Sequence, residues 1–335
     1  MKLLNKKLKQ VVFIGFSPVI DKLFTINKKK KISSILITSP DQYRIMDKKN
    51  KELNCKVFRK LDKNFEKFIK KKFDISNTLF ISISSRWIFK KKQIYFFNNK
   101  LVNFHSSRLP YFKGGATFSW QILCGDKIHC NSIHLVNTKI DNGPIIFSKR
   151  SIFPSRCKIP LDYQEYDLEQ LLKLYESFLS KVINNETFAL KNQSEGIGNY
   201  FPRLESKKDS WINWELKADE INKFINAFDD PYYGSQTFNT RFKKKILRIK
   251  SVHLHEGEIS KHPILSGVVI RNDVNWLVVS LGEKNYTLLI EKVLNQENLN
   301  IIKKIKSGDR FYTPIKFLDN SKRIRSKFGA SGRVL

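Results

Sequence analysis

The stretch LVNFHSSRLPYFKGGATFSWQILCGDKIHCNSIHLVNTKIDNGPII, residues 101–146, decides how this chain folds. Its first residues are apolar and predict a strand that delivers Asn103 and His105 at its end. A turn with two adjacent glycines follows, and then a segment with helical character from Ala116 to Cys124. A second strand is predicted from Asn131 to Val136. Strand, helix and strand in this order are typical of an α/β sheet.

Three side chains of this stretch have complementary chemistry. Asn103 and His105 share one face of the strand, because side chains at positions i and i+2 point to the same side. Asp141 follows in a loop. An amide or imidazolium stabilises the oxyanion that forms when an amine attacks a carbonyl, and histidine accepts a proton near neutral pH. If Asp141 holds the imidazole in place, the set is suited to acyl transfer to an amine. Taken singly, each residue is more often an ordinary turn or loop residue.

The same residues belong to a two-part motif. N-x-H-x-S-x-L-P runs from Asn103 to Pro110, and D-x-G-P-I-I begins at Asp141, about 36 positions after His105. This motif resembles that of the folate-dependent formyltransferase family. The resemblance implies that Asn103, His105 and Asp141 are the catalytic residues. It also implies that 10-formyltetrahydrofolate is the formyl donor and that a primary amine is the acceptor.

A second segment is similar to the loop with which this family binds the pterin ring of the donor. The family's loop usually contains Tyr-Gly and a later Pro, whereas this chain has Ser85-Arg86 and Lys90 there. Backbone groups often make these contacts, so the substitutions are compatible with the same role. The residues implied to bind the donor are Ser85, Arg86, Trp87, Ile88, Phe89, Gly143 and Pro144.

The first 100 residues alternate between apolar runs and helical patterns. Such alternation predicts a doubly wound, mostly parallel sheet of the Rossmann-like kind, with ligands beyond the carboxyl ends of the strands. No G-x-G-x-x-G motif follows the first strand, which argues against NAD as a ligand. The expected strands are 11–14, 32–37, 55–58 and 78–84, and a helix is expected at 64–71.

The C-terminal part has a different pattern. After an amphipathic helix over 163–184, short alternating segments are separated by Gly, Asn and Asp turns, which indicates a small barrel-like, OB-like domain. We therefore expect a catalytic domain at 9–198, a linker and helix at 199–230, a barrel-like domain at 231–318 and a basic tail at 319–335.

Composition bounds the class of protein. A hydrophobic fraction of 41% excludes general disorder, and a net charge of +31 would attract RNA or phosphorylated substrates. A bias of composition towards Lys, Asn, Ile and Phe explains the charge equally well. Four cysteines without ligand spacing and six histidines predict no metal site. No apolar run reaches membrane-spanning length, so we expect a cytoplasmic protein with reduced thiols.

The acceptor is left open between two amines, that of a nucleotide-linked amino sugar and that of initiator methionyl-tRNA. The D-P-Y-Y-G segment at 230–234 is similar to that of sugar-modifying family members, whereas the net charge favours tRNA. We favour the sugar and expect Arg108, Lys113 and Arg203 to hold its phosphates. The oligomeric state is also open, with a homodimer as one option.

Other classes fit less well. A formyltetrahydrofolate hydrolase would use the same three residues with water as acceptor, but it usually carries an N-terminal regulatory domain. A serine hydrolase built on Ser106 or Ser107 lacks the G-x-S-x-G motif. A non-catalytic RNA-binding protein would make the two-part motif incidental, and no RNA-binding motif supports it.

Overall fold

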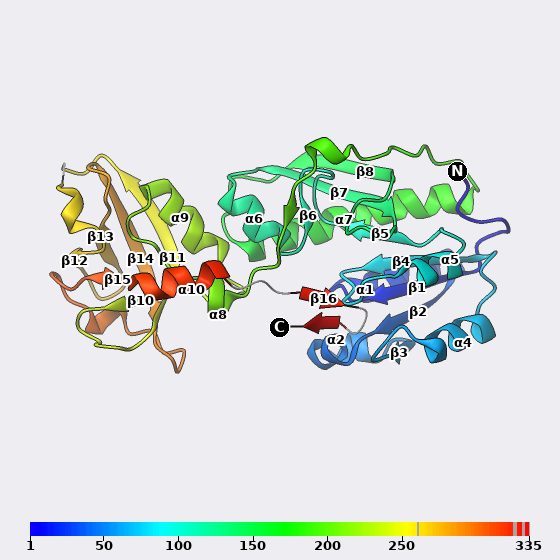
Figure 1. Ribbon diagram of the computed structural model, residues 1–335, viewed down its shortest axis with the longest axis horizontal. Helices are drawn as coiled ribbons and strands as arrows, with labels where there is room; N and C mark the ends of the chain where they lie inside the picture. Colours follow the sequence, from blue (N-terminus) through cyan, green and yellow to red (C-terminus); the bar gives the residue numbers. More distant parts are fainter. Residues whose placement is uncertain (260, 324–326, 330–331, 335) are drawn as a thin grey trace.

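The computed structural model describes residues 1–259, 261–323, 327–329 and 332–334. Two sheets lie in two separate units, which are joined by a linker and by the helices α6 (Thr117–Leu123), α8 (Ser206–Asp209) and α9 (Ala218–Ala227) (Figure 1). The expected α/β sheet followed by a barrel-like sheet is confirmed.

The N-terminal unit contains a seven-stranded sheet with the order β3-β2-β1-β4-β5-β7-β8. The strands from β3 to β5 are parallel, and β7 and β8 run antiparallel to their neighbours, so the sheet is mostly parallel as expected. The strands are β1 (Gln10–Gly15), β2 (Ser33–Thr38), β3 (Cys55–Val57), β4 (Thr78–Ile83), β5 (Val102–His105), β7 (Ile128–Leu135) and β8 (Ile145–Ile152).

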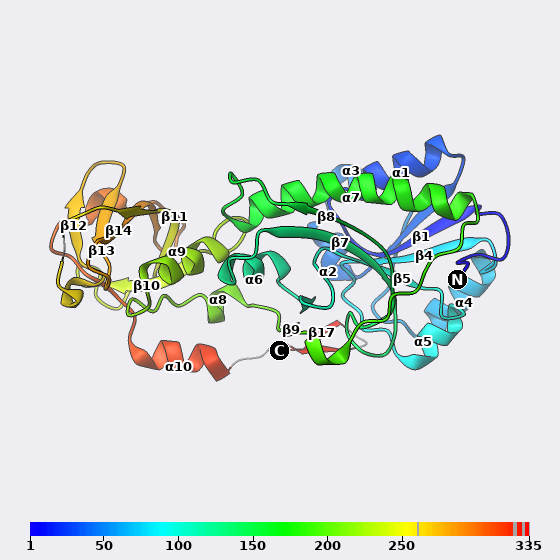
Figure 2. The ribbon, with the colours of Figure 1, turned by 90° about the horizontal axis from the view of Figure 1, so that it is seen from above.

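Helices cover both faces of this sheet (Figure 2). Successive residues of β1 point to opposite faces, so Phe13 packs with α1 (Ile20–Lys29) and α7 (Pro160–Ile183). Its neighbour Val12 packs with α4 (Lys63–Lys72) and α5 (Lys91–Phe96) on the other face. Both faces of the sheet are therefore covered and shielded from water, which explains why the sequences of β1 and β4 are nearly continuous apolar runs.

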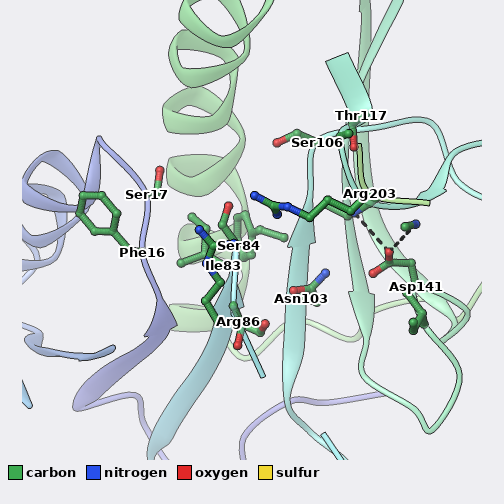
Figure 3. A pocket seen from close by; sticks show the side chains of 18 of the residues that line it. Phe16, Ser17, Ile83, Ser84, Arg86, Asn103, Ser106, Thr117, Asp141 and Arg203 are labelled. Carbon is green, nitrogen blue, oxygen red and sulfur yellow. Dashed lines mark hydrogen bonds and ion pairs between the residues drawn. The ribbon is translucent and has the colours of Figure 1, made fainter. Parts of the chain in front are cut away.

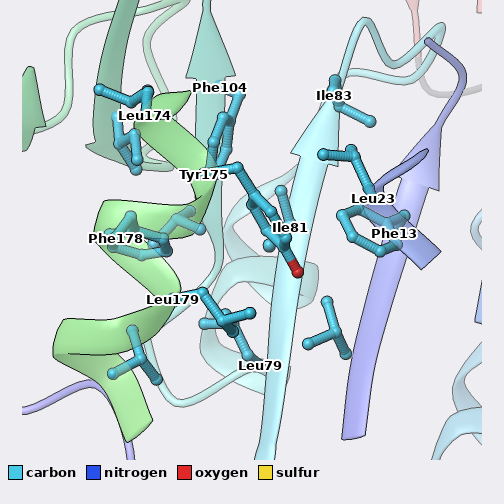
Figure 4. Packing of buried hydrophobic residues seen from close by; sticks show 14 of the residues in the cluster. Phe13, Leu23, Leu79, Ile81, Ile83, Phe104, Leu174, Tyr175, Phe178 and Leu179 are labelled. Atoms are coloured by element: carbon cyan, nitrogen blue, oxygen red, sulfur yellow. The ribbon is translucent and has the colours of Figure 1, made fainter. Parts of the chain in front are cut away.

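The long helix α7 anchors the carboxyl half of the sheet (Figure 4). Tyr175 and Phe178 are fully buried against the strands, and Phe104 of β5 contacts both rings at centroid distances of 6.1 and 5.7 Å. The Tyr175 hydroxyl donates to the Asn27 side chain at 2.6 Å, which satisfies a polar group in this core. This packing holds β5, and hence the residues at its end, in a fixed position.

The C-terminal unit is a curled antiparallel sheet with the order β12-β13-β14-β11-β10-β15. An isolated bridge between Val268 and Arg310 joins its two edges, so the sheet is nearly closed. Gly267 has a φ of +80°, and a Cβ there would lie 2.2 Å from the Phe311 carbonyl, so only glycine fits at this seam. The strands are β10 (Ser235–Asn239), β11 (Leu247–Glu256), β12 (Val269–Asn272), β13 (Leu277–Ser280), β14 (Tyr286–Leu294) and β15 (Phe311–Tyr312).

Several elements were not expected from the sequence. Strand β8, which pairs with the preceding strand β7, is one of them. The short parallel pair of β6 (Lys113–Gly114) with β9 (Tyr200–Phe201) is another, and it joins segments far apart in the chain. The expected tail at 319–335 begins inside α10 (Ile315–Arg323), and 324–326, 330–331 and 335 lie outside the described residues. The remaining elements are α2 (Pro40–Ile45), α3 (Lys48–Lys51), β16 (Lys327–Gly329), β17 (Gly332–Val334) and three 3₁₀ turns, Glu195–Ile197, Pro263–Leu265 and Ile302–Lys304.

None of the helices in the described ranges is both long enough and apolar enough to cross a membrane.

Candidate active site

A cavity of about 630 Å³ lies at the carboxyl ends of β4 and β5 (Figure 3). One wall is the segment 82–89, which comprises the end of β4 and the loop after it. Another is the loop 136–141 after β7, and α7 supplies a third. The linker adds Arg203, and the start of the C-terminal unit adds Tyr232. A cavity of this size at strand ends is typical of a ligand site in an open α/β sheet.

Asn103, His105 and Asp141 converge in this cavity. Asn103 and His105 come from the end of β5, and the loop after β7 brings Asp141 back to them. The His105 Nδ1 atom lies 3.7 Å from Asp141 Oδ2. An amide, an imidazole and a carboxylate thus line one wall, as acyl transfer to an amine requires.

The tautomer of His105 follows from its neighbours. Its Nε2 atom lies 2.8 Å from the Phe112 carbonyl oxygen, which can only accept, so Nε2 carries the hydrogen. Neutral His105 therefore has its lone pair on Nδ1, the atom that faces Asp141. Ser107 donates to the same Phe112 carbonyl at 2.6 Å and holds it in position. The imidazole is set to take up a proton at Nδ1, beside a carboxylate that stabilises the resulting cation.

Asp141 is held as an anion. Burial alone would raise its pKa, but nearby His105 and His134 and the Gly114 N–H, which donates to Oδ2 at 2.9 Å, outweigh it and hold the pKa well below the ordinary value. The backbone of Asp141 is left-handed, with a φ of +48°, and Gln193 donates to its carbonyl at 2.9 Å. Hydrogen bonds thus hold both the side chain and the backbone of Asp141 in place.

His134 is a further residue of this group. It lies opposite Asn103 in the antiparallel pairing of β5 with β7, and the Asn103 amide nitrogen lies 3.1 Å from His134 Nε2. The Nδ1 atom of His134 donates to the Leu135 carbonyl at 2.8 Å, so neutral Nε2 accepts from Asn103. One amide hydrogen of Asn103 is thereby fixed, and the other stays available for an oxyanion in the cavity. His134 Nε2 also lies 3.5 Å from Asp141 Oδ1.

The segment after β4 forms the far wall of the cavity. Trp87 and Phe89 line the cavity and are buried in the core beneath the loop, so their rings support this wall. Arg86 lies 3.3 Å from Asp41, and Gln42 donates to the Ser84 carbonyl at 2.8 Å. The helix α2 therefore braces this loop from behind.

Two chain segments match known domain families. Residues 12–176 match the model of a family described as formyl transferase, and residues 205–304 match that of the formyl transferase C-terminal domain. Together these matches cover well over half of the chain.

The chain belongs to the formyl transferase family.

Two relatives of this formyl transferase have names that describe different activities. The bifunctional polymyxin resistance protein ArnA of Wigglesworthia glossinidia brevipalpis is 27% identical over 66% of this chain and 33% of that protein. The methionyl-tRNA formyltransferase of Prochlorococcus marinus subsp. pastoris is 29% identical over 76% of this chain and 77% of that protein. The chain thus matches about a third of the first protein's length.

A solved structure has the same fold. The crystal structure of WlaRD, a sugar 3N-formyl transferase in the presence of dTDP and 5-N-formyl-THF, aligns with a TM-score of 0.66 at 18% identity. The alignment covers 88% of this chain and 100% of that one, so the likeness includes both sheets.

The sequence prediction missed His134. A strand was expected there, but its partner was not, and only the pairing with β5 shows that His134 faces Asn103. The available signal was that this histidine lies in the strand predicted from Asn131 to Val136, two residues before its end. In this structure the contact with His134 holds one hydrogen of the Asn103 amide.

The residues expected to hold the donor and the acceptor do not all line the cavity. Ser85 to Phe89 line the cavity, whereas Gly143 and Pro144 do not. A Cβ at Gly143 would lie 1.7 Å from the Leu135 carbonyl, so this glycine allows the Asp141 loop to pack closely on β7.

Of the three expected phosphate-binding residues, only Arg203 lines the cavity. Arg108 pairs with Asp126 at 3.1 Å and stacks on Tyr111, and Lys113 is buried and bonded to Asn142. The side chains of Arg108 and Lys113 thus contact residues that do not line the cavity. In the described part of the chain, no group of three or more His, Cys, Asp or Glu residues could hold a metal ion.

Proposed function

We propose that this protein transfers a formyl group from 10-formyltetrahydrofolate to the amine of a nucleotide-linked amino sugar. The observation that supports the proposal is the convergence of Asn103, His105 and ionised Asp141 on one wall of a cavity of about 630 Å³. The family supplies the reaction class, and the structure supplies the groups that the reaction needs.

The reaction follows from the positions of these groups. The neutral amine attacks the formyl carbon, and the second N–H of Asn103 stabilises the oxyanion; one such donor contributes ~3 kcal/mol. His105 takes the proton from the attacking nitrogen at Nδ1, and Asp141 stabilises the imidazolium. The bond from carbon to N10 of the folate then breaks, and N10 receives that proton. The products are the formamide and tetrahydrofolate.

Support for the folate donor comes from the loop 85–89 and from the fold. In family members of this kind the loop binds the pterin ring, and here it forms one wall of the cavity. The structure of WlaRD, with the same fold, was determined in the presence of 5-N-formyl-THF. Buried Trp87 and Phe89 keep the loop rigid, which lowers the entropy cost of binding.

The donor assignment predicts thermal protection. The stable analogue 5-formyltetrahydrofolate at 100 times a micromolar Kd should stabilise the protein by about 2.7 kcal/mol, which is several degrees in Tm. Differential scanning fluorimetry measures this shift. NADH at equal concentration is the control, because the turn after β1 lacks the dinucleotide-binding glycines. No shift with the folate, or an equal shift with NADH, would refute the donor assignment.

Support for the sugar acceptor comes from Arg203. In Figure 3 its side chain points across the cavity toward Ile83 and Ser84. Guanidinium groups bind phosphates with paired hydrogen bonds, so Arg203 is suited to the diphosphate of a nucleotide sugar. The methionyl-tRNA alternative is supported by the Prochlorococcus relative and by the net charge of +31.

The salt dependence of the reaction distinguishes a sugar-nucleotide acceptor from a tRNA acceptor. Formylation of a dTDP-linked amino sugar should fall less than tenfold between 50 and 200 mM salt, because few phosphates are contacted. A tRNA held by six or more phosphate contacts would lose about 10³-fold in affinity over the same range. Initial rates with both acceptors measure the slopes. Turnover of methionyl-tRNA alone, with the steep slope, would reverse the assignment.

Arg203→Ala should raise the KM for the sugar nucleotide and leave the folate KM unchanged. The matched control is Arg150→Ala, an exposed arginine of β8 that does not line the cavity.

A further inference from the structure

A second polar group reaches the same cavity from its other side. Ser106 Oγ donates to Asp167 Oδ2 at 2.8 Å, and His129 Nε2 lies 3.0 Å from Asp167 Oδ1. Ser106 follows β5, Asp167 lies on α7 and His129 lies on β7. Asp167 and His129 are 3% and 2% exposed, yet Ser106 and Asp167 line the cavity. This set, the Asp167 group, has no part in the chemistry described above.

The hydrogens of the Asp167 group have a definite arrangement. Ser151 and Tyr166 extend it, because Ser151 Oγ lies 2.9 Å from His129 Nδ1 and accepts from the Tyr166 hydroxyl at 3.1 Å. Because a carboxylate oxygen accepts, His129 Nε2 carries the hydrogen that it donates to Asp167; the Asn131 side-chain amide lies 3.3 Å from the same Nε2 atom. The carboxylate accepts from His129 with one oxygen and from Ser106 with the other. The single hydrogen of Ser106 is thus used, and its oxygen offers only lone pairs to the cavity.

The position of Ser106 relates it to the acceptor. It is the neighbour of His105 in sequence, so it lies beside the reacting centre. In Figure 3, Ser106 and Thr117 are at one end of the view, and Phe16 and Ser17 are at the opposite end beyond Ser84 and Arg86. Arg86, which belongs to the loop 85–89 that we assign to the donor, lies between these two ends in Figure 3 and on the Phe16 side of Ser106. A group that contacts Ser106 therefore belongs to the acceptor, and it must be a hydrogen-bond donor.

We propose that Ser106, oriented by Asp167 and His129, determines acceptor specificity by accepting a hydrogen bond from a hydroxyl group next to the reacting amine. This inference rests on the proposed formyl transfer and names its substrate class, a vicinal amino alcohol as found in amino sugars. A methionyl ester offers no such donor, because its amine is flanked by an ester carbonyl and a thioether side chain. The buried Asp167 group would leave that substrate facing an unpaired oxygen, which is costly.

The test compares two acceptors in the wild type and in Ser106→Ala. The probes are a dTDP-linked 3-amino-3,6-dideoxyhexose with hydroxyl groups beside the amine and its analogue lacking them. In the wild type, kcat/KM should favour the hydroxylated probe by about tenfold, the value of one hydrogen bond. In Ser106→Ala this preference should fall to about one, with the folate KM unchanged. A change of stability alone would affect both probes equally.

Two further variants complete the design. Asp167→Asn offers an amide hydrogen to Ser106, which frees the serine hydrogen to turn toward the cavity, and it should reduce the preference at least threefold. If Ser106→Ala does not fold, the acceptor preference of Asp167→Asn tests the inference instead. Ser177→Ala is the matched control, because the side chain of this exposed serine of the same helix donates to the Lys173 carbonyl and does not line the cavity. It should keep the tenfold preference.

The outcomes separate the inference from the proposed function. A sugar preference that is the same in wild type and Ser106→Ala overturns the role of Ser106 and leaves formyl transfer intact. Formylation of methionyl-tRNA with no turnover of either sugar also overturns it, because formyl transfer then proceeds without the vicinal hydroxyl. If neither amine is formylated although 5-formyltetrahydrofolate binds, the proposed function itself fails, and the inference with it.

Discussion

Replacing His105 by alanine should lower kcat by ~10²-fold or more, because the variant loses the base that takes the amine's proton. Loss of the imidazolium beside the reacting carbon removes electrostatic stabilisation as well. The KM for the folate should change little, since the proposed reaction places His105 at the transferred formyl group and the pterin at the loop 85–89. Steady-state rates with saturating donor and acceptor measure the effect.

His105→Gln is the sharper companion variant. Glutamine can still donate to the Phe112 carbonyl, which His105 contacts at 2.8 Å, so the local structure is retained without a base. We expect the same loss of kcat and a Tm close to that of the wild type. A kcat within threefold of the wild type in either variant would remove His105 from the mechanism.

Asp141→Asn should have a comparable effect on kcat through another route. The amide has a similar shape, but it carries no charge to stabilise the His105 imidazolium 3.7 Å away. We expect a loss of ~10²-fold or more in kcat with both substrates still bound. Asp319→Asn, at a half-exposed position of α10 outside the cavity, is the control and should leave kcat unchanged. Wild-type kcat in Asp141→Asn would contradict the assignment.

The pH dependence of stability reports on the same residue. The pKa of Asp141 in the folded protein is depressed below its ordinary value of 3.8, so its ionised form stabilises the fold. This contribution is present above about pH 4 and is lost as the pH falls through the folded-state pKa. The difference in Tm between wild type and Asp141→Asn should therefore shrink when the pH is lowered from 5 to 3. A difference that grows in this range would show that the pKa is raised instead.

Local sequence predicts much of this molecule, because the relevant signals extend over a few residues. Apolar runs ending in turns predict β1, β2, β4 and β5, and the amphipathic pattern over 163–184 predicts α7, which spans Pro160–Ile183. The family motif predicts Asn103, His105 and Asp141, and the alternation at the end of β5 explains why the first two share a face.

The tertiary structure alone brings the distant partners together. The register of β5 against β7 places His134 opposite Asn103, and the pairing of β6 with β9 brings the linker, and Arg203 with it, to the cavity. Helix α7 supplies Asp167 to Ser106 from 61 positions further along the chain. The sequence determined which candidate catalytic groups stand at the strand ends, because their identities and the ends of their strands are local properties. Only the folded chain decided which groups orient them, because strand register and helix packing depend on contacts between segments that no local pattern relates.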